Sequence, residues 1–194
     1  MNDTQSPLPA PFLLTIAYAP QGLQDRLSWL IALDQRLLSV LQRASEPMIA
    51  QLRLSWWRDA LNSPPENRPK GEPLLAKLEP IDPDSCLAGV GLDLVDAYEV
   101  MATETGGEAL VVARRMRIEA VVHIYAGWLG LAVQDLDSVV AYWADAVLPM
   151  PKSLPRSLRP LTIWALAERL ENADTQTGIF GRGIRLNWHA LTGR

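Results

Sequence analysis

Apolar side chains recur every three or four residues along most of this 194-residue chain. From Leu23 to Arg43, for example, they occupy positions 27, 30, 31, 37, 38 and 41. This spacing places them on one face of an α-helix. The chain has no alternating run of β-branched residues and no Asn-Gly or Asp-Gly hairpin turn, which are the usual signals of strands. The pattern therefore predicts an all-α protein, and the length predicts one domain over residues 1–194.

Proline and glycine set the predicted ends of the helices. Long helices are predicted over residues 23–43, 47–61, 82–104, 108–134, 137–147 and 156–172, with shorter ones at 73–79 and 184–191. Residues 1–12 are expected to be flexible. Residues 62–73 contain four prolines and one glycine and are expected to form a loop within the domain.

The second predicted helix, over residues 47–61, has one apolar stripe. We expect its apolar face to contain Met48, Ile49, Leu52, Trp56 and Ala60. That face would pack on the first helix, mainly through Leu52 and Trp56 against Leu38 and Leu41. Arg53 and Trp57 are four residues apart, which allows a cation–π pair on the helix surface.

Charge and cysteine content limit the classes of partner. The formal net charge is -4 with a pI near 5.2, which argues against nucleic acid. The one cysteine, Cys86, rules out a disulfide within the chain and favours a reducing compartment. No leader sequence and no apolar stretch of membrane-spanning length are apparent. We therefore expect a cytoplasmic protein, with peripheral membrane contact left open.

Few residues suggest catalysis. The chain has no glycine-rich phosphate loop, CxxC, HExxH or GxSxG motif. Glu119 with His123 could be an acid–base pair or a polar pair in the core. The acidic residues Asp93, Asp96 and Glu99 could be metal ligands or a row exposed to solvent. The basic cluster of Arg114, Arg115 and Arg117 could bind a phosphate or form a charged helix face.

Asp34 is more informative, because it lies within the apolar stripe of the first helix. Burying an unpaired carboxylate is costly. Asp34 is therefore expected either to pair with an arginine or to face a polar cavity, and we favour the pair. Arg53 and Arg58 of the next helix are the expected partners, and Trp57 completes this candidate cavity or ion-pair set.

Three stretches of the sequence resemble one enzyme family. The most specific is Ser45-Glu46-Pro47 followed by QLRLSWWRDAL at residues 51–61; the others are Tyr18-Ala19-Pro20 with LIALD at 30–34, and WHALTGR at 188–194. Together, and in their order along the chain, these stretches resemble the squalene/phytoene synthase family. The resemblance implies a helical bundle of the isoprenoid (terpenoid) synthase type around a central cavity. Active members use two aspartate-rich helices to hold Mg²⁺ against isoprenoid diphosphates, because carboxylate oxygens suit Mg²⁺.

The chain departs from that family where the acids are expected. The first acidic motif falls on Leu38, Ser39 and Gln42, and the arginine before it on Gln35. The second has no DxxxD counterpart within residues 127–134, because the nearby Asp135 and Asp137 are two apart. We therefore expect no catalytic residue, metal site or cofactor, with Mg²⁺ required only if the chain is an enzyme.

Two functions follow from the resemblance. The first is a degenerate relative acting as an assembly or interaction factor for a protein partner, similar to the family branch that assembles respiratory complex I. The alternative is a divergent prenyltransferase, or a binder of a prenyl chain or another lipid. Whether the chain is an enzyme stays open at this point.

Overall fold

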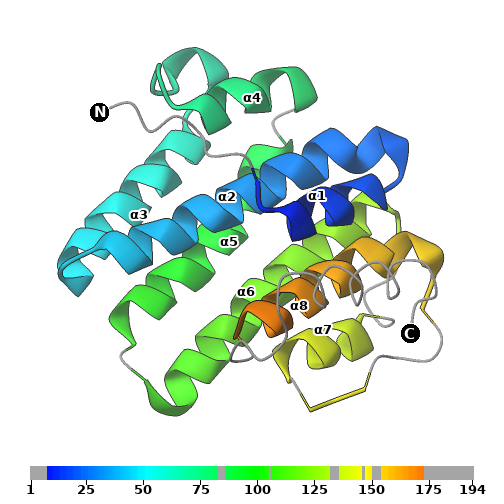
Figure 1. Cartoon of the computed structure of the whole chain (residues 1–194). Coiled ribbons are helices and arrows are strands. Elements are labelled where there is room, and N and C mark those ends of the chain that lie inside the picture. The colour runs from blue at the N-terminus through cyan, green and yellow to red at the C-terminus, as the bar shows by residue number, and fades with distance from the viewer. Residues whose placement is uncertain are drawn as a thin grey trace.

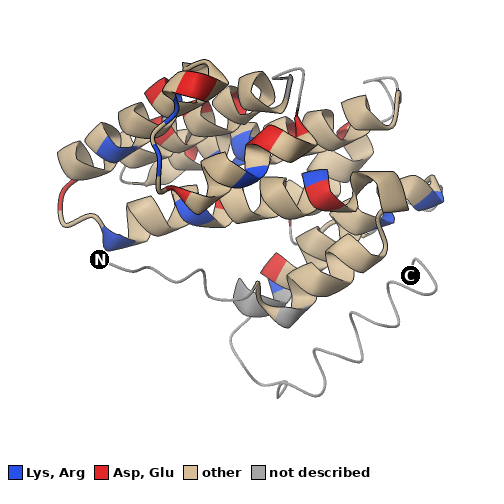
Figure 2. Ribbon diagram, turned by 90° about the horizontal axis from the view of Figure 1, so that it is seen from above, with Lys and Arg blue, Asp and Glu red and all other residues tan. Residues whose placement is uncertain are grey.

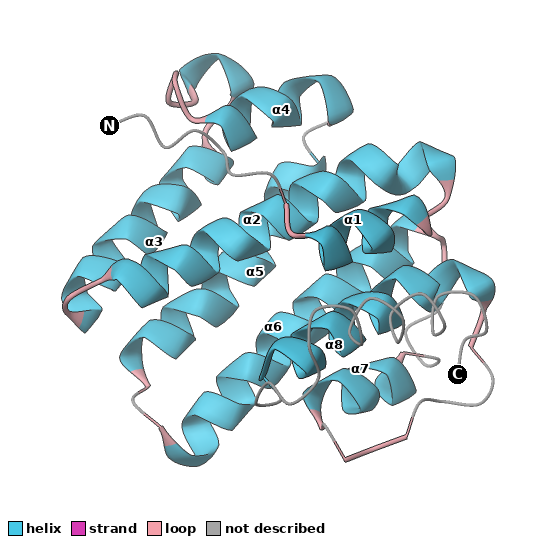
Figure 3. Ribbon diagram, in the orientation of Figure 1, coloured by secondary structure: helices cyan, strands magenta, loops and turns pink. Residues whose placement is uncertain are grey.

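The structure is a computed structural model, which describes residues 8–82, 86–104, 106–131, 136–145, 147–149 and 154–172. Within these ranges the chain forms eight α-helices and no strand (Figure 3). They are α1 Ala10–Ala17, α2 Gln24–Arg43, α3 Pro47–Asn62, α4 Pro73–Ile81, α5 Cys86–Thr103, α6 Gly107–Trp128, α7 Asp137–Ala144 and α8 Arg159–Asn172. Short 3₁₀ helices lie at Gln21–Leu23, Pro65–Asn67 and Arg156–Leu158. The all-α prediction is confirmed.

Helix α2 crosses the middle of the bundle (Figure 1). It contacts α1, α3, α4 and α5. Further along the chain α5 packs on both α3 and α6, while α8 packs on α1 and α7. One apolar cluster draws buried side chains from all eight helices. The buried face of α2 therefore lies where side chains from distant segments meet.

Most of the predicted helix limits agree with the structure, and the differences have local causes. The helix predicted over 108–134 ends at Trp128, because Gly130 adopts a left-handed φ of 66° that stops it. Gly89 and Gly91 do not interrupt α5. The helix predicted over 137–147 ends at Ala144. The helix predicted over 184–191 lies outside the described residues.

The N-terminal expectation needs a correction for the residues that the structure describes. Helix α1 was not predicted, and it includes residues 10–12 of the segment expected to be flexible. Phe12 is buried in the core, where its ring meets Trp164 of α8 edge to face at 6.0 Å. This aromatic contact and the packing of α1 on α8 fix the segment.

The predicted apolar face of α3 is right for Ala60 but wrong for Met48, Leu52 and Trp56. The face that packs inward contains Ala50, Leu54, Trp57, Ala60 and Leu61, which α5 and α2 cover. By contrast, Met48, Leu52 and Trp56 are 67%, 63% and 42% exposed. They therefore cannot form the predicted contact with Leu38 and Leu41.

Charged residues do not gather by sign on the helices. Figure 2 shows acidic and basic segments beside each other on the same helices. None of the helices in the described ranges is long and apolar enough to cross a membrane.

Candidate functional site

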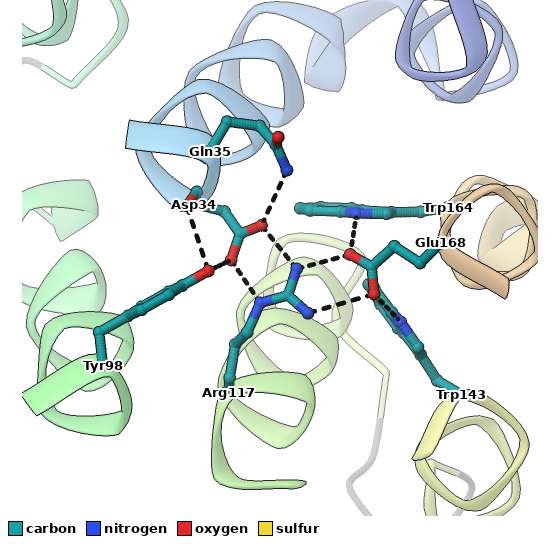
Figure 4. A network of polar contacts seen from close by, with 7 residues as sticks. All are labelled: Asp34, Gln35, Tyr98, Arg117, Trp143, Trp164 and Glu168. Carbon is teal, nitrogen blue, oxygen red and sulfur yellow. Dashed lines mark hydrogen bonds and ion pairs between the residues drawn. The ribbon is translucent and has the colours of Figure 1, made fainter. Parts of the chain in front are cut away.

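A polar network occupies the interior of the bundle (Figure 4). Its residues come from five helices: Asp34 with Gln35 from α2, Tyr98 from α5, Arg117 from α6, Trp143 from α7, and Trp164 with Glu168 from α8. The side chain of Asp34 is fully buried, and those of Arg117 and Glu168 are 11% and 21% exposed. We call this set the α2–α8 network.

Arg117 donates two parallel hydrogen bonds to Asp34. Its Nε donates to Oδ1 at 2.6 Å, and its Nη2 donates to Oδ2 at 2.6 Å. Such bidentate, charge-assisted pairs are among the strongest hydrogen bonds in proteins. The Tyr98 hydroxyl adds a bond to Oδ1 at 2.9 Å, and the Gln35 amide adds one to Oδ2 at 3.4 Å. Each oxygen of Asp34 therefore accepts two bonds.

The other side of the same guanidinium holds Glu168. Nη2 of Arg117 donates to Oε1 at 2.6 Å, and Nη1 donates to Oε2 at 3.2 Å. The indole N–H of Trp164 donates to Oε1 at 2.9 Å, and that of Trp143 to Oε2 at 2.8 Å. The centres of the two indole rings lie 5.2 Å apart, and the guanidinium carbon of Arg117 lies 5.8 Å from the centre of the Trp143 ring. Glu168 is thus as fully bonded as Asp34.

Opposing electrostatic effects set the protonation of the network. Burial alone would lower the pKa of Arg117, but the negative charges of Asp34 and Glu168 raise it well above its ordinary value. Burial would raise the pKa of Glu168, but the charge of Arg117 and hydrogen bonds from Arg117 and both indoles hold it below its ordinary value. Burial, and then the charge of Asp34, raise the pKa of Tyr98. The folded state therefore favours a charged arginine, a charged Glu168 and a neutral tyrosine.

Saturation of the carboxylates decides what the network can do chemically. A carboxylate offers about four lone-pair positions, and both Asp34 and Glu168 accept four hydrogen bonds. Neither group has a free lone pair for a metal ion or for a proton from a substrate. The arginine thus takes the position that a metal cation would need between the two acids.

The prediction for Asp34 is right about burial and about an arginine partner, but both expected partners are wrong. Arg53 is exposed to solvent. Arg58 pairs instead with two acids of α5, Asp96 and Glu99; its Nη2 lies 2.7 Å from Oε2 of Glu99. The arginine that reaches Asp34 is instead Arg117 of α6.

Trp57 also differs from its prediction. It is buried and meets Trp56 edge to face, with 5.1 Å between ring centres. In the described part of the chain, cation–π contacts join Arg117 to Trp143 and Arg169 to Tyr142. Arg53 and Trp57 do not form the predicted pair.

Four residues were predicted to stand at the family's acidic-motif positions and at the arginine before them, and all four lie on α2. Gln35 donates to Asp34, Ser39 donates to the carbonyl oxygen of Arg36 at 2.8 Å, Leu38 packs against the core and Gln42 is exposed. Over the described residues, no group of three or more His, Cys, Asp or Glu side chains could hold a metal ion.

Among the remaining candidates, the acidic row on α5 follows its ordinary interpretation as a charged helix face. Glu119 and His123 are not the polar core pair of the ordinary interpretation, and Arg117 of the basic cluster lies in the buried network rather than on a charged helix face. Asp96 and Glu99 bind Arg58, and Asp93 is exposed. Glu119 pairs with Arg115 at 2.8 Å, and His123 is exposed.

Sequence reasoning missed most of the network. Tyr98, Trp143 and Trp164 carried no signal that separates them from core aromatics. Arg117 appeared only within a basic cluster, and Glu168 was not among the candidates. One signal was present: Glu168 follows Trp164 by one helical turn, so a carboxylate continues a buried face and needs a cation there.

Comparison of the chain with protein-family models, with curated proteins and with solved structures gives no match.

Proposed function

We propose that this chain is a non-catalytic helical scaffold of the squalene/phytoene synthase type, which acts by binding a protein partner. The observation that carries the proposal is the saturation of Asp34 and Glu168 by hydrogen bonds from Arg117, Tyr98 and the network indoles. Diphosphate chemistry needs carboxylates that are free to ligate divalent ions. Here the two interior carboxylates are neutralised by an internal cation.

Two further observations support the proposal. The positions of the first acidic motif, at Leu38, Ser39 and Gln42, offer no carboxylate. Large apolar side chains are left exposed on α3, as expected of a protein that binds another protein. An isoprenoid synthase type of bundle, and a cytoplasmic location with peripheral membrane contact, are part of the same proposal.

The test is a search for prenyl chemistry with the full chain. Labelled farnesyl or geranylgeranyl diphosphate is incubated with the protein and Mg²⁺ or Mn²⁺, and products and released diphosphate are measured. We expect no turnover above the protein-free control, and no gain in the Leu38→Asp, Gln42→Asp double variant, because the second acidic motif is also missing. Turnover well above background would reject the scaffold proposal in favour of a divergent prenyltransferase.

A binding measurement separates the remaining alternative. Trp143 and Trp164 lie in the network, so their emission reports on a ligand that enters the interior. Saturable quenching by farnesyl diphosphate without turnover would favour a prenyl-chain binder. An unchanged spectrum is expected of the scaffold.

A further inference from the structure

Helix α6 consists of an exposed half followed by a packed half. Within residues 108–116 only Ala113 is buried, whereas residues 118–126 supply most of the buried side chains of this helix. Figure 1 shows the start of α6 at the lower edge of the bundle. The first turns of α6 therefore meet solvent on most of their sides.

One side of this exposed half carries an ordered stripe. Glu108, Val111, Val112 and Arg115 lie at i, i+3, i+4 and i+7, so they share one face of the helix. Val111 and Val112 are 64% and 51% exposed. Valine is a weaker helix former than alanine, because its branched side chain loses rotamer freedom in a helix. These two valines therefore stabilise the protein only if another surface covers them. We call the four residues the α6 outer stripe.

The charges of the stripe lie at its two ends, with the valines between them. Glu108 makes no hydrogen bond or ion pair with any described residue. Arg115 donates from its Nε to Glu119 at 2.8 Å, and the N–H groups of its two Nη atoms remain available. Arg114, the other exposed charge within residues 108–116, lies about a third of a turn from Glu108 around the helix and so falls outside the stripe.

We propose that two copies of the chain associate through the α6 outer stripe, with their α6 helices antiparallel about a two-fold axis between Val111 and Val112. Such an interface is self-complementary, because if residue i meets residue j, then j also meets i. Glu108 of each copy then lies opposite Arg115 of the other copy, and the valines fill the centre. Parallel helices would instead place like charges beside each other, which repel. The order acid, valine, valine, base is thus the observation that commits the stripe to a second copy.

Glu119 does not remove Arg115 from this arrangement. One guanidinium can hold two carboxylates, as Arg58 holds Asp96 and Glu99 in the same chain. Glu119 lies one turn beyond Arg115, so in the antiparallel pair it lies near the N-terminal end of α6 of the second copy. A negative charge is favourable at that end of a helix.

The contact is small, because each copy contributes only a few turns of one helix. It should bury less than the roughly 1,200 Å² of a stable interface, so we expect a weak dimer with a dissociation constant of roughly 10 µM to 1 mM. This inference goes beyond the proposed scaffold function and does not depend on it.

The test is sedimentation velocity of the full chain over about 10 µM to 1 mM protein. Glu108→Arg and Arg115→Glu each place like charges opposite each other at both symmetric contacts. Each variant alone should therefore dimerise roughly tenfold or more weakly than wild type. In an equimolar mixture, the new arginine of one variant faces the new glutamate of the other, and the unchanged Arg115 faces the unchanged Glu108. The mixture should therefore dimerise about as strongly as wild type.

Two further variants assign the contact to α6. Val112→Glu places two carboxylates beside the two-fold axis and should abolish the dimer. Leu52→Glu, at an exposed apolar position of α3, is the matched control and should leave the dimer unchanged. Circular dichroism checks that each variant stays folded.

Several results would overturn the inference. One is a wild type that stays monomeric up to about 1 mM. Another is a dimer that Val112→Glu leaves intact or that Leu52→Glu removes. A mixture of the two charge variants that associates no better than each alone would reject the antiparallel pairing. Binding to phosphatidylcholine–phosphatidylglycerol vesicles that Val112→Glu removes, without any dimer, would assign the stripe to a lipid surface. None of these results bears on prenyl turnover, which would reject the scaffold proposal and leave the dimer standing.

Discussion

Replacing Arg117 with methionine tests the central electrostatic argument. The substitution keeps much of the side chain's length but removes the four hydrogen bonds to Asp34 and Glu168. Two carboxylates are then left inside the bundle without a cation, and Asp34 is fully buried. Breaking a buried pair in this way costs about 3–5 kcal/mol. A domain has about 5–15 kcal/mol of total stability, so the variant should be close to unfolding.

The assay is equilibrium unfolding in urea at neutral pH, followed by far-UV circular dichroism. Arg58→Met is the matched control, because Arg58 also binds two carboxylates but its side chain is 35% exposed. Surface ion pairs contribute about 0–1 kcal/mol, so this variant should lose no more than that. The contrast between the two arginines separates the effect of burial from the effect of charge pairing.

A triple variant isolates the uncompensated charge. Asp34→Asn, Glu168→Gln and Arg117→Met together leave no charge in the network, and neutral replacements of buried ion pairs are often tolerated. We expect the triple variant to recover much of the stability that Arg117→Met loses. The reasoning would be refuted if Arg117→Met lost less than about 1 kcal/mol, or if the triple variant were no more stable than the single one.

Two further variants test the network and the packing of α5. Because the folded-state pKa of Glu168 lies below its ordinary value of 4.5, its contribution is present above pH 4.5 and is lost as the pH falls through the folded pKa. In urea melts over a pH series, Glu168→Gln should be less stable than wild type at neutral pH by about 1–3 kcal/mol, and the gap should narrow in acid; a constant gap would contradict this. In α5, Gly89→Ala should stabilise by about 0.5–1 kcal/mol, because a Cβ at Gly89 meets no atom within 4 Å. A Cβ at Gly91 comes within 3.2 Å of three side chains of α2 and α3. Gly91→Ala should therefore be less stable than Gly89→Ala by about 1 kcal/mol or more in urea melts. Equal unfolding midpoints for the two variants would contradict this, because they would show that the packing of α5 on α2 and α3 can relax.

The sequence was sufficient for most of the helices but not for their contacts. Helices α2 and α3 were predicted within one residue at each end, because their signals are local: apolar spacing, and Pro47 in the first turn. Helix α1 was missed because eight residues beside two prolines give a weak periodic signal. What stabilises α1 is its packing on α8, about 150 residues further along the chain.

The Asp34 pairing shows the same limit at the candidate site. The cost of a buried carboxylate is a property of one residue, so the need for a cation could be predicted. The choice of cation depends on which arginine side chain reaches Asp34 once the helices have packed. Arg53 and Arg58 are closer in sequence, but Arg117, which is 83 positions away, is the one that the topology brings to Asp34.

The error on α3 has a related cause and explains why an apolar stripe of this helix is exposed. The helix has two apolar stripes: one with Met48, Leu52 and Trp56, and the other with Leu54, Trp57 and Leu61. Periodicity cannot choose between them, because spacings of three and of four residues both place side chains on one face of a helix. Folding buries only the second, since α5 and α2 reach α3 from that side. A chain that needed α3 only for its own core would gain solubility from polar residues on the other side. The exposed apolar stripe is therefore the part of α3 that packing within the described bundle does not account for.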